Sequence, residues 1–198
     1  SRLQENLYAI NQIVNLETRR LEKAFEDLND YYNRLTPSDI EKIEVFSGIS
    51  KNSIVEIKNS ADVIDLKKNK ALYSDRQQLD YVYFLISGNV SLIKSSESGE
   101  NRVVFLLNDG SMINEPLMRK NTSGIECWGF EDSKILRIGL NTFDKIMSKD
   151  YILARNCMLE MEKRIRRLYR QLKNLTSSNL EKKLAAKLYR LGTQYGLK

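Results

Sequence analysis

The chain has 198 residues, of which 41% are hydrophobic and 29% are charged, so it is long enough to bury the core of one large domain. Two cysteines and no histidine exclude a disulfide-rich scaffold, a four-thiolate metal site, and any histidine-dependent catalysis or metal or haem ligation within this chain. The sequence has no apolar run of about 18 residues and no signal-peptide pattern. We therefore expect a cytoplasmic protein with reduced cysteines and no membrane span.

The net charge of +6 is concentrated at one end. Residues 163–198 contain eleven Lys and Arg and one acidic residue, a net charge of +10, whereas residues 1–162 have a net charge of −4. This asymmetry predicts that the C-terminal end faces a polyanion, the alternative being a solvated basic helix face.

The first 57 residues have helical patterns. Residues 1–35 predict a long amphipathic helix or a helix pair, because an apolar stripe recurs at spacings of three, four and seven: Leu3, Leu7, Ile10, Val14, Leu21, Leu28 and Leu35. Pro37 is suited to the first position of a new helix, whose apolar face we expect to continue to Gly48. Residues 50–57 predict a further helical turn, capped by Ser50 or Ser53.

From about residue 62 the pattern changes to short apolar runs between turn residues. The clearest strand is 81–86, and further strands are predicted at 90–93, 102–107, 125–130 and 134–138. Asn69 is expected in a turn, where it tolerates a left-handed backbone. Turn signals every 8–12 residues predict a small β-sandwich or barrel.

Helical patterns return at about residue 140. Asn141 is predicted to cap a short helix through Met147, and a long helix begins near Asp150. Its apolar seam alternates spacings of four and three, which predicts packing on a partner helix or, alternatively, on the chain's own β-domain; the seam is Ala154, Met158, Met161, Ile165, Leu168, Leu172 and Leu175. The opposite face carries Arg164, Arg166, Arg167 and Arg170. A last amphipathic helix covers 180–191, after an interruption at 174–179.

The order of these elements, and several sequence stretches, resemble the effector half of the CRP/FNR family of bacterial transcription regulators, over about residues 45–198. DYVYFLISGNVSLIKSSESGE (80–100) resembles the family's central strand pair, with Gly88 as its turn glycine and Gly99 at the next hairpin. LLNDGSMINEPL (106–117) resembles the strand and phosphate-binding loop of cyclic-nucleotide binders, and NLTSSNLEKKLAAKLYRLGTQYG (174–196) resembles the hinge and first helix of the DNA-binding domain.

The resemblance implies an α+β fold, in which N-terminal helices and a long C-terminal dimerisation helix flank an antiparallel β-roll. It divides the chain into an N-terminal helical segment (1–57), a β-roll effector domain (58–149), a dimerisation helix (150–174), and a hinge with the first helix of a DNA-binding domain (175–198).

The resemblance also implies a function that is not enzymatic. A signal in the roll would pass through the long helix of a homodimer to a helix-turn-helix domain beyond Lys198, which would bind DNA. The dimer interface would be the apolar seam given above. The expected effector-binding residues are Asn114, Glu115, Ser123, Gly124, Cys157, Met158 and Met161. No cofactor and no metal site are expected.

Departures from the family pattern argue against cyclic AMP as the effector. Asn114 replaces the loop glycine, Glu115 is retained, and Pro116 removes a backbone donor. The phosphate-neutralising Arg-Ser pair would fall near Ser123-Gly124, where there is no arginine; Arg119 and Lys120 precede that position. A small organic or peptide-like effector, direct protein contacts, or no effector remain as alternatives.

Two further interpretations stay open. Cys127 and Cys157 are expected to be small buried hydrophobes, with a redox pair as the alternative. The chain could instead be a ligand-free β-roll and coiled-coil interaction module without DNA binding, which the stripe in residues 1–35 favours. An enzyme is disfavoured, because carboxylates such as Glu115 and Glu126 have no spacing typical of catalysis.

Overall fold

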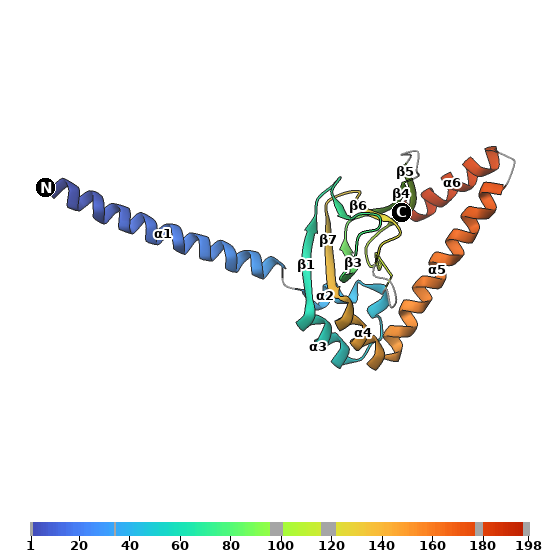
Figure 1. Cartoon of the computed structure of the whole chain (residues 1–198), viewed down its shortest axis with the longest axis horizontal. Helices are drawn as coiled ribbons and strands as arrows, with labels where there is room; N and C mark the ends of the chain where they lie inside the picture. The colour runs from blue at the N-terminus through green and yellow to red at the C-terminus, as the bar shows by residue number, and fades with distance from the viewer. Residues whose placement is uncertain (1, 34, 96–100, 116–121, 177–179, 196–198) are drawn as a thin grey trace.

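The computed structural model describes residues 2–33, 35–95, 101–115, 122–176 and 180–195 (Figure 1). The helices in these residues are α1 (Arg2–Asn33), α2 (Pro37–Glu41), the 3₁₀ helix η1 (Glu44–Phe46), α3 (Lys51–Ser60), α4 (Leu140–Lys149), α5 (Tyr151–Thr176) and α6 (Leu180–Tyr195). The strands are β1 (Ala61–Leu66), β2 (Ala71–Tyr73), β3 (Tyr81–Ser87), β4 (Val90–Ser95), β5 (Asn101–Leu107), β6 (Glu126–Gly129) and β7 (Ser133–Gly139).

The strands form two antiparallel sheets. One has the order β1-β7-β3 and the other has the order β2-β6-β4-β5. Val82 and Phe84 of β3 lie opposite Ile138 and Leu136 of β7, which is the central strand of the first sheet. This arrangement is the antiparallel β-roll with flanking helices that the sequence predicts.

The turn at Gly88 connects the two sheets. β3 pairs with β7, whereas β4 pairs with β5 and β6, so the predicted central strand pair within 80–100 is not a hairpin of two paired strands. Gly88 has a φ of +97°, and a Cβ there would lie 2.7 Å from the carbonyl oxygen of Asp132. Only glycine adopts this conformation without strain, which explains the residue at the change of sheet. Gly99 lies outside the described residues.

Two apolar cores fill the domain. One lies between the first sheet and helices α2 to α5, and it includes Phe46, Phe84 and Phe143. The ring of Phe84 makes tilted contacts with those of Phe46 and Phe143, at centroid distances of 4.8 and 5.5 Å. The other lies inside the roll and includes Tyr73, Tyr83 and buried aliphatic side chains from both sheets. The roll interior is therefore packed with side chains.

The local signals at the helix starts are mostly confirmed. Thr36 and Asp39 form a capping box with Pro37 at the start of α2, and Ser50 caps α3. The prediction that Asn141 caps α4 is wrong, because the cap position is Gly139, with no side-chain hydrogen bond. The apolar face expected up to Gly48 is divided between α2 and η1. Asn69 has the predicted left-handed backbone, with φ of 60°.

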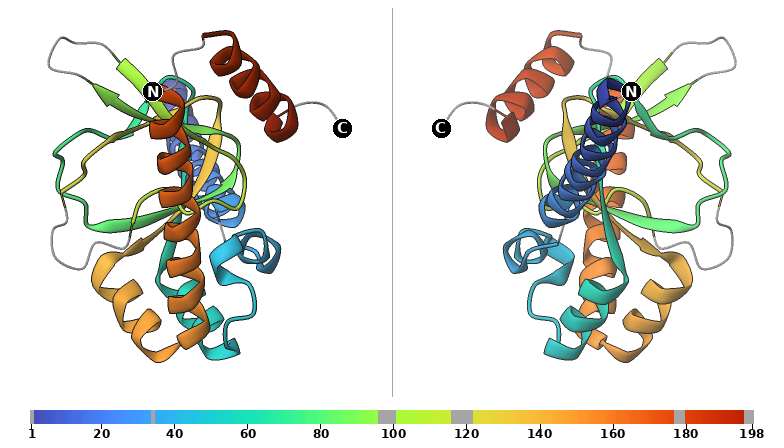
Figure 2. Two further views of the ribbon diagram at one scale, coloured as in Figure 1. Left: turned by 90° about the vertical axis from the view of Figure 1, so that its right-hand side faces the viewer. Right: turned by 90° about the vertical axis from the view of Figure 1, so that its left-hand side faces the viewer.

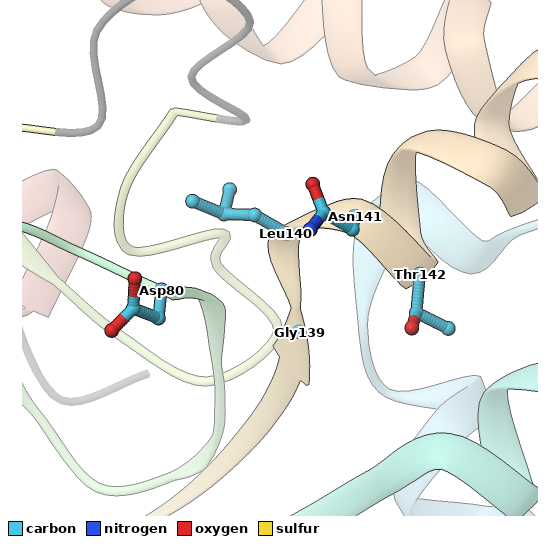
Figure 3. Close-up of a pocket in the computed structure, with 5 residues that line it drawn as sticks. All are labelled: Asp80, Gly139, Leu140, Asn141 and Thr142. Atoms are coloured by element: carbon cyan, nitrogen blue, oxygen red, sulfur yellow. The ribbon is translucent and has the colours of Figure 1, made fainter.

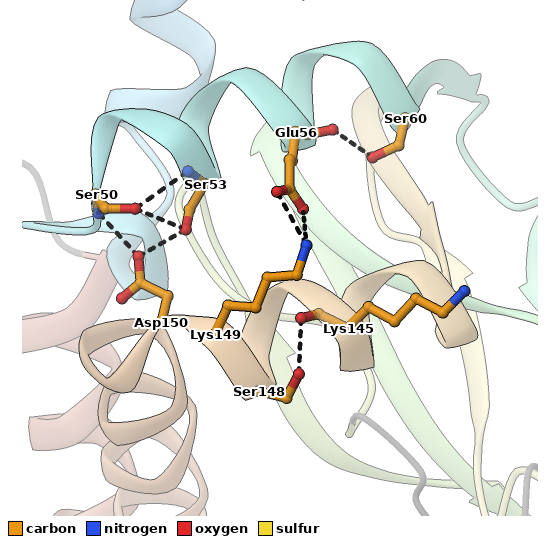
Figure 4. Close-up of polar contacts among 8 residues, drawn as sticks. All are labelled: Ser50, Ser53, Glu56, Ser60, Lys145, Ser148, Lys149 and Asp150. Carbon is orange, nitrogen blue, oxygen red and sulfur yellow. Dashed lines mark hydrogen bonds and ion pairs between the residues drawn. The ribbon is translucent and has the colours of Figure 1, made fainter.

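Asp150 joins α3 to the start of α5 (Figure 4). One carboxylate oxygen accepts hydrogen bonds from the Ser50 N–H at 2.8 Å and from the Ser53 hydroxyl at 2.7 Å. The other accepts from the N–H groups of Ile152 and Leu153, at 3.0 and 3.1 Å, and so caps α5. The start of the long helix is thereby fixed to the rest of the domain.

Helices α1 and α5 lie on opposite sides of the β-domain (Figure 1). α5 runs along one face of the domain (Figure 2), and α1 extends away from it (Figure 1). No helix within the described ranges is both long enough and apolar enough to cross a bilayer.

Candidate effector site

The segment before the loop that resembles a phosphate-binding loop runs along β3. The N–H of Leu85 donates to the carbonyl of Ser111, and the N–H of Ile113 donates to the carbonyl of Tyr83, at 2.9 and 2.7 Å. These bonds fix the position of residues 111–115 against the first sheet.

Asn114 extends this pairing through its side chain. Its amide oxygen accepts from the Tyr83 N–H at 2.8 Å, and its amide nitrogen donates to the Tyr81 carbonyl at 3.0 Å. The side chain is buried, and both of its polar atoms are used by the backbone of β3. Asn114 therefore has a structural function where the family pattern has glycine, and its role toward an effector stays a prediction.

Arg164 reaches this segment from α5. Its guanidinium donates to the carbonyl oxygens of Met112 and Ile113, the latter at 3.2 Å, and lies 3.6 Å from a carboxylate oxygen of Glu115. Arg164 is only 5% exposed, whereas the Glu115 side chain is half exposed. The buried Nε of Arg164 has no hydrogen-bond partner within the described part of the chain. The Arg164 guanidinium thus connects the long helix to the start of the loop, and its Nε–H remains an unused donor.

The positive charge of Arg164 affects the pKa of two buried groups in the roll interior, Cys127 and Tyr73. Burial raises the pKa of Cys127, and Arg164 partly offsets that effect. Burial also raises the pKa of Tyr73 well above its ordinary value, and the neighbouring Cys127 and Glu115 raise it further. Both groups therefore stay neutral at physiological pH.

Ser123 and Gly124 lie at the other end of the loop, beside the β2–β3 connection. The N–H of Arg76 donates to the Ser123 carbonyl at 2.8 Å, and the Lys94 ammonium donates to the Gly124 carbonyl at 2.8 Å. Lys94 also pairs with Asp75 at 2.9 Å. No contact in the described part of the chain brings Ser123 or Gly124 to Asn114 or Glu115. Pro116, Arg119 and Lys120 lie outside the described residues.

The three candidates on α5 have different surroundings. Cys157 is buried in the core beneath the first sheet, and Met161 packs against the same core. Burial raises the pKa of Cys157 to about 12, so its thiol is not ionised at neutral pH. Met158 is 62% exposed and belongs to the seam. Their effector-binding roles remain predictions.

The seam has two parts. Ala154 and Met161 pack partly against the body of the domain. Four members lie exposed along the outer side of α5: Met158, Ile165, Leu168 and Leu172. Leu175 belongs to α5, but its side chain lies outside the described residues. An apolar stripe left exposed in this way fits a helix that pairs with a partner.

The body-facing side of α5 becomes polar in its second half. Leu153 and Cys157 are buried, and Arg164 and Gln171 follow at intervals of seven residues. The Gln171 amide donates to the Val104 carbonyl at 3.0 Å. The expectation that Arg164 lies on the outer basic face is therefore wrong, although Arg166 and Arg170 do lie exposed. Its spacing from Leu153 and Cys157 is the sequence signal that would have placed Arg164 on the inner side.

Cavities occur elsewhere in the described structure. One of about 290 Å³ lies where β7 meets α4, and Figure 3 shows its lining: Asp80, Gly139, Leu140, Asn141 and Thr142. A second, of about 200 Å³, lies beside β1 and the start of β7. Neither includes a predicted effector residue. No group of three or more potential metal ligands occurs among the described side chains.

Comparisons with known proteins identify the fold. Residues 63–150 match the family model of the cyclic nucleotide-binding domain, and no curated protein sequence matches the chain. A similar solved structure is CLP of Xanthomonas campestris, described as a c-di-GMP responsive global regulator, with a TM-score of 0.66, 12% identity and 75% of each chain covered.

Two other regulators are similar. FixK2 from Bradyrhizobium japonicum has a TM-score of 0.62 and 15% identity, over 69% of this chain and 68% of that one. The catabolite activator protein of Thermus thermophilus has a TM-score of 0.59 and 17% identity, over 67% of this chain and 63% of that one.

Residues 63–150 are therefore similar to a cyclic nucleotide-binding domain. The fold of the chain is that of the CRP/FNR-family regulators, which confirms the resemblance and the fold class predicted from the sequence.

Proposed function

We propose that this chain is the effector-sensing and dimerising part of a transcription regulator of the CRP/FNR type. The observation that carries the proposal is the contact of Arg164 with Met112, Ile113 and Glu115, because it connects the candidate effector segment to α5. A change at the segment would then alter how α5 is held. An effector shifts such an equilibrium only if it binds the two arrangements with different affinity.

The proposed effector is a small organic acid other than cyclic AMP. The unpartnered Nε of the buried Arg164 and its long pair with the half-exposed Glu115 leave this guanidinium able to donate to another anion that replaces Glu115. Cyclic AMP is disfavoured because the Asn114 amide is used by β3, and because Ser123 and Gly124 supply no arginine for the phosphate.

Calorimetric titration tests this assignment. Cyclic AMP is expected to give no binding heat, and a panel of carboxylate and phosphate metabolites is expected to contain a ligand. Arg164→Gln should weaken that ligand by about 10- to 100-fold, the effect of losing a hydrogen bond to a charged group. The control for loss of an arginine charge is Arg137→Gln. Arg137 lies on β7, where its guanidinium packs over the ring of Tyr81 on β3, away from the contacts of Arg164 described above. Tight binding of cyclic AMP would overturn the proposal.

The mechanical part of the proposal has a separate test. Arg164→Gln should increase hydrogen exchange in residues 161–173 of α5, because Gln171 would remain the main polar contact of this stretch with the roll. Arg166→Gln is the matched control, as Arg166 is exposed and pairs with Glu162 on its own helix. Equal hydrogen exchange in the two variants would contradict the proposal that Arg164 connects α5 to the candidate effector segment.

DNA binding belongs to the proposal through a domain beyond Lys198. It is supported by the net charge of +10 in residues 163–198 and by the likeness to known regulators. Selection from a random-sequence duplex library with the full-length protein tests it. Failure to enrich any sequence would favour the second candidate, an interaction module without DNA binding, for which the exposed apolar stripe of α1 is the supporting observation.

A further inference from the structure

The described side chains of helix α1 are uncovered. Every described side chain from Gln4 to Glu26 is exposed, and the helix extends away from the domain (Figure 1). Most of the stability of a protein helix comes from packing of its apolar face. Alanine has the highest intrinsic helix propensity, and α1 contains only two alanines. A helix of this composition requires a partner surface.

The exposed residues form a coiled-coil seam. Leu7, Val14 and Leu21 occupy one heptad position, and Ile10, Glu17 and Ala24 occupy the other. Leu7, Ile10, Val14 and Leu21 are each between 54% and 60% exposed. Ile13 and Phe25 beside them are 61% and 69% exposed, so α1 presents a continuous apolar strip to a partner.

The charge at the centre of the seam selects the partner. Glu17 pairs with Arg20 of the same helix at 2.7 Å. In a parallel pair of α1 helices the two Glu17 carboxylates would face each other, which is unfavourable. In an antiparallel pair centred near residue 19, each Glu17 lies opposite Leu21 of the second copy and next to its Arg20, so that the opposite charges attract. The same register places Val14 beside Ala24 of the second copy, a large residue beside a small one.

We propose that α1 is an antiparallel self-association helix, whose occupant is α1 of a second copy of this chain. Because α1 and α5 lie on opposite sides of the domain, α1 pairing leaves the α5 seam free (Figure 1). Two separate two-fold interfaces on one protomer join dimers into larger assemblies. The inference is independent of effector binding and of DNA binding.

Sedimentation velocity of the full chain tests the pairing. The wild type is expected to be larger than a dimer, and Val14→Glu with Leu21→Glu should weaken association through α1 by about 100-fold or more, leaving dimers joined by α5. Gln12→Glu with Asn15→Glu adds the same charge to the outer face of α1 and should sediment like the wild type. Sedimentation of the Val14→Glu, Leu21→Glu protein like the wild type would overturn the inference.

A variant of α5 separates the two interfaces. Leu168→Glu alone should leave dimers joined by α1, and the triple variant should be monomeric. If Leu168→Glu has no effect while the α1 variant does, the α5 seam is wrong and the α1 inference stands.

Disulfide crosslinking tests the orientation. An oxidised mixture of Val14→Cys and Ala24→Cys proteins should give a disulfide between the two variants, while the native cysteines are buried. Val14→Cys alone should remain uncrosslinked, since antiparallel pairing separates its two copies by about 15 Å along the axis. A Val14→Cys homodimer disulfide would overturn the antiparallel arrangement.

Discussion

Removal of the Asp150 charge should destabilise the domain in a pH-dependent way. Burial by itself would raise the pKa of this carboxyl, but hydrogen bonds from the Ser53 hydroxyl and from the N–H groups of Ser50 and Leu153 outweigh it. The pKa falls from its ordinary value of 3.8 to about 2. Asp150→Asn keeps the size of the side chain and removes the charge that these donors stabilise (Figure 4).

The magnitude follows from linkage between protonation and folding. A pKa that is lower in the folded than in the unfolded state contributes stability at a pH above the unfolded value of 3.8, and this stability is lost as the pH falls toward 2. At 1.36 kcal/mol per pKa unit, the ionised carboxylate contributes about 2 kcal/mol at neutral pH. The free energy of unfolding of Asp150→Asn should therefore be about 2 kcal/mol below that of the wild type at pH 7.

Urea unfolding followed by circular dichroism measures this difference across the pH range. The gap between wild type and Asp150→Asn should be constant from about pH 7 to pH 5 and should shrink to less than half by about pH 2.5. Asp144→Asn, at an exposed position on α4, serves as the control for general charge effects. A gap that does not change with pH would refute the reasoning, because the loss would then come from packing and not from the charge.

Three further outcomes are expected. In the chain that carries Val14→Glu and Leu21→Glu, adding Leu168→Glu should convert dimers to monomers, because Leu168 lies 40% exposed on the α5 seam; sedimentation as a dimer would exclude the seam. Cys127 and Cys157 should react slowly with iodoacetamide in the folded protein at neutral pH, since burial raises the pKa of both thiols, and fast labelling before unfolding would contradict their placement. Gly88→Ala should lower the free energy of unfolding by about 2 kcal/mol or more and lower Tm. Gly124→Ala, whose added Cβ meets no atom within 4 Å, should leave Tm nearly unchanged. Equal effects of the two substitutions would argue against backbone strain at position 88.

Local patterns predicted most of the elements but not how the strands pair. Strands β3, β4, β5 and β7 have runs of apolar residues between turn residues, and the structure has them near the predicted positions. β2 has three residues and an irregular register with β6, which is too short for a periodic signal. The change of sheet at Gly88 was missed because a turn glycine between two strands is equally consistent with a hairpin.

The sequence predicts one of the two charged residues of the candidate site, Glu115, and misses the other, Arg164. Glu115 was selected from its loop position, and the structure places it near α5. Arg164 was missed as a site residue because a basic residue on an amphipathic helix is normally solvated. Its burial depends on carbonyl groups of Met112 and Ile113, some fifty residues away in the chain, and one helix sequence contains no information about such partners.

The contacts of α5 with the roll have a consequence for how such domains diversify. Arg164 and Gln171 donate to main-chain carbonyls of residues 112, 113 and 104, and every amino acid carries that acceptor. Substitutions at those three roll positions therefore preserve the acceptors as long as the backbone keeps its path. The side chains of the roll can therefore change over evolution while the same two helix side chains continue to hold the helix in place.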